Sequence, residues 1–156
     1  MRPNTLAERY QTLIQEELGL MAHIDEDQDV IFRHPDLGSL YVRLDADKDP
    51  EYLMLVYPSF ANQQSTGLDL VSALNVVNEA NRTCKAAKAY LIPRSEDEEG
   101  YRLSATIECF LAGSDQAPDP ALLKAVMARN LKALQHLVQC IARACKEQQQ
   151  PRASCH

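Results

Sequence analysis

The stretch from Leu68 to Leu91 constrains the fold most, because it reads as a helix, a break and then a strand. At about 100° per residue, several side chains gather on one side of this helix. They are Leu70, Val71, Leu74, Val77, Asn78 and Asn81. Such a side has to be covered, so we predict that it is the inner face of the helix.

The rest of the chain supplies two more helices and four more strands. Thr5, with Glu8 three residues later, forms a capping-box pattern that begins a helix over 5–18. Alternating or continuous apolar runs predict strands over 30–34, 40–44, 52–57 and 101–111, in addition to the strand of the first stretch, which covers 84–92. Asp119 and Pro120 begin a last helix that runs to about Lys146.

This order is helix, three strands, helix, two strands, helix. Strands and helices are grouped rather than strictly alternating, which predicts an α+β fold with a mostly antiparallel five-stranded sheet and helices packed on it. The last helix carries an apolar stripe at three- and four-residue steps, long enough to cross a sheet or meet a partner. We expect one domain over 1–146, followed by a loose polar tail over 147–156.

Charge and composition exclude several classes of partner. The net charge is −6, which opposes binding to phosphate backbones, so we expect no nucleic acid. No apolar run approaches the roughly 20 residues that cross a bilayer, so we expect no membrane span. The N-terminal residues lack the apolar centre of a secretory signal, which favours the cytoplasm and reduced forms of the five cysteines.

No recognisable catalytic or metal-binding motif occurs in the sequence. A nucleophile elbow, a phosphate-binding glycine loop and an H-E-x-x-H pair are all missing. His136 and Cys140 are four residues apart and would share one side of the last helix as metal ligands. Only these two ligands are visible, and cationic residues flank them, so an exposed helix face is favoured. We therefore predict no catalytic residues, no metal and no cofactor.

Two features of the 68–82 helix bear on function. Asn78 and Asn81 are inward amides that must find partners, and we interpret them as structural bonds to the backbone near the following strand. Contact with a ligand is the alternative. Ala73, Val76 and Ala80 lie on the predicted outer side, where small residues permit close approach of another helix. Contact with a partner, simple helix-forming preference and coverage by the chain's own loops all fit these three residues. We name them as candidate partner-binding residues.

The order of elements and several short motifs resemble the YbjN-like family, which shares the type III secretion chaperone-like fold. The residues concerned are the segments 49–53, 75–78 and 85–91. The resemblance implies a three-layer arrangement of helices against a twisted antiparallel sheet, often in a homodimer. Secretion chaperones of this fold bind an extended client segment and hydrolyse nothing.

The sequence therefore favours a chaperone-like module that binds another protein or a client peptide as a homodimer, and that is not an enzyme. A regulatory or adaptor protein that senses a small ligand near Asn78 and Asn81 is the main alternative. The third possibility is an enzyme of unfamiliar type. Loss of a hydrolase or transferase activity on replacing Cys84 or His34 with Ala would indicate it.

Overall fold

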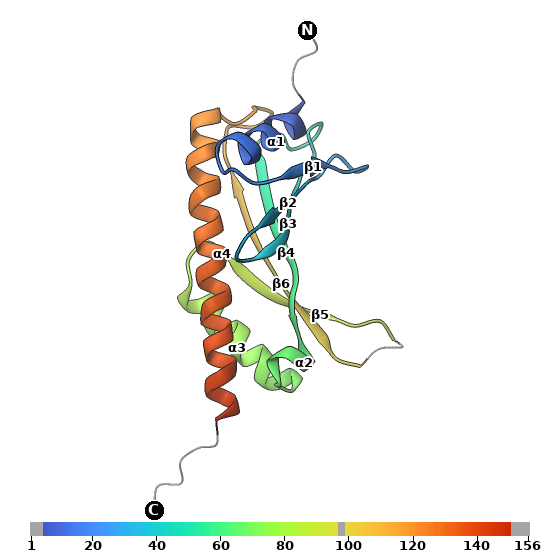
Figure 1. The fold of residues 1–156 in the computed structure, drawn as a ribbon, viewed down its shortest axis with the longest axis vertical. Coiled ribbons are helices and arrows are strands. Elements are labelled where there is room, and N and C mark those ends of the chain that lie inside the picture. The colour runs from blue at the N-terminus through green and yellow to red at the C-terminus, as the bar shows by residue number, and fades with distance from the viewer. Residues whose placement is uncertain (1–4, 97–98, 151–156) are drawn as a thin grey trace, which may run out of the picture.

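The computed structural model describes residues 5–96 and 99–150, and Figure 1 shows their arrangement. The helices are α1 (Leu6–Glu16), α2 (Gln63–Thr66), α3 (Leu70–Thr83) and α4 (Pro120–Gln149). The strands are β1 (Ala22–Ile24), β2 (Val30–His34), β3 (Gly38–Arg43), β4 (Tyr52–Asn62), β5 (Lys88–Pro93) and β6 (Tyr101–Phe110).

The strands form one antiparallel sheet, which confirms the predicted α+β class. The sheet has six strands in the order β1-β2-β3-β4-β6-β5, where five were predicted. The additional strand is β1, whose three residues pair with β2. Residues 58–67 lie between the predicted strand over 52–57 and the predicted helix over 68–82. They extend β4 and form α2, which ends in a left-handed Gly67.

One face of the sheet carries the main core. The other, the open face, has no described helix packed on it, although Val56 and Thr106 are buried there. Val30, Val42, Leu55 and Ile107 are register partners across β2, β3, β4 and β6, and all four are buried. They belong to one core that also contains residues of α1, α3 and α4. The described helices therefore cover a single face and the fold has two layers, so the implied three-layer arrangement is wrong (Figure 1).

Helix α4 lies along the buried face and spans most of the length of the molecule (Figure 1). Its 30 residues extend about 45 Å at about 1.5 Å per residue. The Asp119 carboxylate accepts the backbone N–H groups of Ala121 and Leu122, which confirms the predicted start. The helix continues to Gln149, whose amide donates to the Thr66 carbonyl, so residues 147–149 are not part of a loose tail. Residues 151–156 lie outside the described residues.

The buried side of α3 is the opposite of the predicted one. Leu70, Val71 and Leu74 are exposed, and of the predicted inward set only Val77 is buried. The buried residues are Ala73, Val76, Val77 and Ala80. Helix α3 packs against α4 and β5 of the same chain through this side, so the close approach that small residues permit is used within the chain.

Asn81 joins the end of α3 to the beginning of β5. Its side-chain nitrogen donates to the Ala89 carbonyl at 3.0 Å, and its side-chain oxygen accepts the Ala89 N–H at 2.8 Å. The predicted structural role of Asn81 is thus confirmed. Asn78 and Asn81 are both exposed, so the predicted inward position of the two amides is wrong.

Replacing Asn81 with Ala is expected to lower the free energy of unfolding by about 1–3 kcal/mol, because both backbone groups of buried Ala89 lose their side-chain partner. Asn78→Ala on the same helix is the matched control and is expected to change stability by less than about 0.5 kcal/mol. Urea unfolding followed by far-ultraviolet circular dichroism measures both. Equal effects of the two variants would contradict this role for Asn81.

Candidate functional site

The outer side of α3 carries the first candidate surface, an aliphatic patch of Leu70, Val71 and Leu74. Their side chains are 53%, 67% and 48% exposed. Positions i, i+1 and i+4 of a helix fall within about 100° of one another, so the three side chains form one contiguous surface. The helix is held in place from its N-cap, where the Asp69 carboxylate accepts the Ser72 N–H at 2.8 Å.

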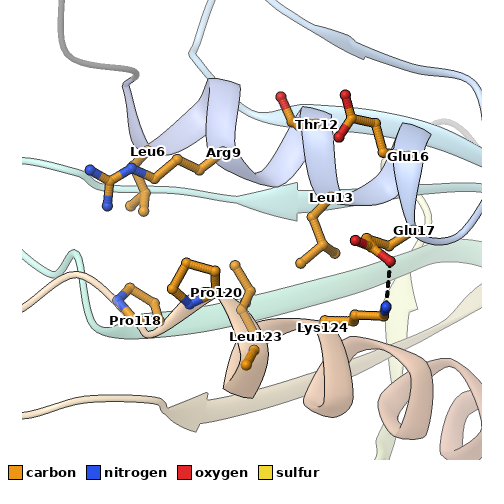
Figure 2. Close-up of a pocket in the computed structure, with 11 residues that line it drawn as sticks. Leu6, Arg9, Thr12, Leu13, Glu16, Glu17, Pro118, Pro120, Leu123 and Lys124 are labelled. Atoms are coloured by element: carbon orange, nitrogen blue, oxygen red, sulfur yellow. Dashed lines mark ion pairs between the residues drawn. The ribbon is translucent and has the colours of Figure 1, made fainter.

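A groove between α1 and the beginning of α4 is the second candidate, and Figure 2 shows its side chains. Its volume is about 410 Å³. The apolar lining comes from Leu6, Leu13, Pro118, Pro120, Ala121 and Leu123. Charged side chains lie at the rim, where Lys124 and Glu17 form an ion pair (Figure 2). A groove of this kind fits an apolar group flanked by polar or charged atoms.

Aspartates line a wider hollow at the β2–β3 end of the open sheet face. Asp25 accepts the backbone N–H groups of Asp27 and Asp29, and Asp29 accepts the N–H of Leu44 at 2.9 Å. These oxygens stabilise the turns that join β1 to β2 and lead out of β3. The arrangement accounts for the acidic residues as turn-forming groups.

Glu108 is the centre of a polar network on the open sheet face. It forms an ion pair with Lys88 and accepts the Tyr52 hydroxyl at 2.9 Å. The hydrogen bond from Lys88 is the main reason that the pKa of Glu108 lies below its ordinary value, and the Tyr52 hydroxyl adds to this effect. Burial raises the pKa of Tyr52, and the bond to Glu108 raises it further.

The other predicted residues have structural positions. Ala73, Val76 and Ala80 are at most 6% exposed and lie in the chain's own core, so the prediction that they face a partner is wrong. The buried thiol of Cys145 has a raised pKa because of desolvation, as expected of a small apolar core residue. His34 accepts the N–H of Asp36 at 3.1 Å through Nδ1 and so stabilises its turn.

Acidification is expected to destabilise the natural protein more than a Glu108→Gln variant. The pKa of Glu108 is lowered in the folded chain, so the ionised form contributes stability at neutral pH that is lost as the pH falls through that lowered pKa. Urea midpoints compared at about pH 7 and about pH 3 measure this difference. Glu99→Gln, at an exposed loop position, is the control and should follow the natural protein. An identical loss in the Glu108→Gln variant would contradict the argument.

Comparison with known proteins supports the fold. No protein-family model matches the chain, and no curated protein sequence matches it. The chain is similar to the crystal structure of YbjN from E. coli, described as "a putative transcription regulator", with a TM-score of 0.64 and 12% identity over 94% of each chain. No helix within 5–96 and 99–150 has the length and apolar character to span a membrane. The chain therefore has a YbjN-like α+β fold.

Proposed function

We propose that this protein is a cytoplasmic, non-catalytic protein-binding module that acts as a homodimer and holds a client polypeptide in a chaperone-like manner. The aliphatic patch on α3 is the observation that carries the proposal. Three aliphatic side chains of one helix turn outward, while its opposite side is buried in the core. The described cysteines are free, which suits a reducing compartment.

The patch favours a protein surface as its partner. Covering aliphatic area removes it from water at about 25 cal/mol per Å², and the three residues offer no charged or hydrogen-bonding side chain to a polar ligand. A two-fold axis would place the same patch of a second copy opposite it, which makes a self-complementary interface from one helix. We therefore assign the patch to the homodimer contact.

The α1–α4 groove is the better place for a client segment. Its apolar lining can accept side chains of an extended polypeptide, and the rim charges of Arg9 and Glu16 can meet polar groups beside them. The groove and the patch lie on different helices, so dimer formation and client binding can be tested separately.

Leu74→Asp and Val71→Asp are each expected to shift the protein from dimer to monomer, because a charge would be buried in an apolar contact. Size-exclusion chromatography with light scattering measures the mass, and circular dichroism confirms folding. Leu122→Asp is the control, since Leu122 is an exposed aliphatic side chain of α4 outside the patch. A natural protein that stays monomeric at high concentration would contradict the dimer.

Thr12→Trp is expected to fill the groove and weaken client binding by at least about tenfold, which corresponds to about 1.4 kcal/mol. Reduced and carboxymethylated α-lactalbumin serves as an extended polypeptide, and fluorescence anisotropy measures its affinity. Ala125→Trp adds the same ring at an exposed position of α4 outside the groove and should leave affinity unchanged. Failure of the natural protein to bind the polypeptide would contradict client holding.

The second candidate function is a regulatory or adaptor protein that senses a small ligand. The Asn81 amide is committed to Ala89, so the predicted pocket at Asn78 and Asn81 no longer supports it. The α1–α4 groove supports ligand sensing instead, because its volume falls within the usual range of ligand sites. An apolar anion such as anilinonaphthalene sulfonate would then raise the Tm of the natural protein but not of Thr12→Trp. This result, with no binding of the polypeptide, would favour ligand sensing over client holding.

A further inference from the structure

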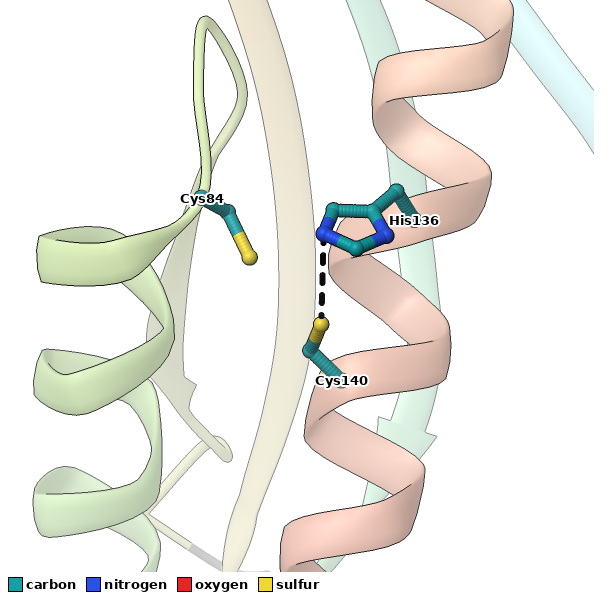
Figure 3. Close-up of side chains that lie close together, drawn as sticks. All are labelled: Cys84, His136 and Cys140. Carbon is teal, nitrogen blue, oxygen red and sulfur yellow. Dashed lines mark hydrogen bonds between the residues drawn. The ribbon is translucent and has the colours of Figure 1, made fainter.

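The end of α3 and the middle of α4 bring three metal-ligating side chains together, as Figure 3 shows. Cys84 is the C-cap residue of α3, and His136 and Cys140 lie on successive turns of α4. Their ligand atoms all lie within 4.8 Å of one another. The sequence showed only two of these possible metal ligands, His136 and Cys140, and the fold adds Cys84 as the third.

We propose that Cys84, His136 and Cys140 form a binding site for a thiophilic transition metal ion, with Zn²⁺ as the best fit. Two thiolates and an imidazole are soft or borderline ligands, which zinc prefers and which calcium and magnesium do not. Three protein ligands leave a fourth tetrahedral position for water, and His136 is exposed on that surface of α4.

The distances match a tetrahedral site. Zinc bonds of about 2.3 Å to sulfur and about 2.05 Å to nitrogen, at tetrahedral angles, place sulfur and nitrogen about 3.6 Å apart and two sulfurs about 3.8 Å apart. Cys140 Sγ and His136 Nε2 are 3.6 Å apart. Every other pair of ligand atoms is within 4.8 Å, so Cys84 Sγ needs to approach by no more than about 1 Å, which one side-chain rotation can supply.

The charges around the site agree with a metal held by two thiolates. Lys132 lies one turn before His136, and Arg143 follows Cys140 by three residues, so both flank the site on α4. Two thiolates and a divalent ion sum to zero charge, so these cations do not oppose binding. Burial raises the pKa of the Cys84 thiol, and the adjacent Cys140 thiol raises it further, so a metal would have to displace the proton of Cys84 on binding.

The ion would connect α3 to α4. Cys84 ends α3 and begins the connection to β5, while both other ligands belong to one rigid helix. A metal bound by all three residues would hold the end of α3 against α4 independently of apolar packing. Its role is therefore a structural link with one open coordination position.

Titration of the full-length, fully reduced protein with Co²⁺ is the direct test. A site with two thiolates is expected to give intense sulfur-to-cobalt absorption and the visible bands of tetrahedral Co²⁺, saturating at one equivalent, and Zn²⁺ is expected to abolish them. All samples carry Cys155→Ser and His156→Ala, so that these residues cannot supply ligands. Absence of the thiolate absorption in the folded protein would overturn the proposal.

Single variants identify the ligands. Cys84→Ser, His136→Ala and Cys140→Ser are each expected to weaken Zn²⁺ binding at least about 100-fold, measured in competition with a chromophoric chelator. Loss of a residue that only hydrogen-bonds to a metal ligand already lowers metal affinity 10–100-fold, so loss of a ligand should cost at least as much. Cys109→Ser and His23→Ala are matched controls outside the cluster and should bind as the natural protein does. Unchanged affinity in the three ligand variants would overturn the assignment.

Thermal unfolding gives a readout that does not depend on spectroscopy. Zn²⁺ is expected to raise the Tm of the natural protein and of the controls but not that of the ligand variants. His136 is exposed, so His136→Ala tests the site even where a cysteine variant fails to fold. A disulfide between Cys84 and Cys140 in protein isolated without reductant, together with no metal uptake after reduction, would replace the metal site with a redox pair.

Discussion

The packing of α4 against the sheet is the interaction on which the rest of the structure depends. Turn after turn of this helix places an apolar side chain on the same buried face: Leu123, Met127, Leu131, Leu134, Leu137, Ile141 and Cys145. Full burial of a Leu, Ile or Met side chain contributes about 1.5–3 kcal/mol. This long helix, together with α1 and α3, thus closes the sheet face that β2, β3, β4 and β6 present. The opposite face has no described helix packed on it and carries the Glu108 network instead.

The position of α4 accounts for the side of α3 that is buried, which carries Ala73 and Ala80. Both helices lie on the same face of the sheet, so α3 has to fit beside a helix that already occupies much of it. Ala73 and Ala80 are small enough to let another backbone come close, and Val76 and Val77 are buried on the same side. Leu70, Val71 and Leu74 lie on the other side of the helix and stay exposed. The candidate protein-binding patch is therefore a consequence of how the core is filled.

This competition for space also explains what the sequence could predict. The strand 101–111 and the last helix each have a single apolar face, and the helix caps at Thr5 and Asp119 depend on hydrogen bonds within a few residues. Such local patterns were predicted correctly. Helix α3 is apolar on two sides, so periodicity alone does not decide which side is buried. The prediction that the side with Leu70, Val71 and Leu74 is buried was wrong, because the space left beside α4 decided which side of α3 faces the core.

Contacts between residues far apart in the sequence were the other feature that the sequence could not predict. Spacing along the sequence revealed His136 and Cys140, while Cys84 joins them only because α3 ends beside α4. The aliphatic patch begins at the first residue of α3, and Cys84 follows its last, with about 21 Å of helix between them. The buried side of α3 already sets the direction in which Leu70, Val71 and Leu74 face. A metal at Cys84 would add a second link between this helix and α4, at the end opposite the patch.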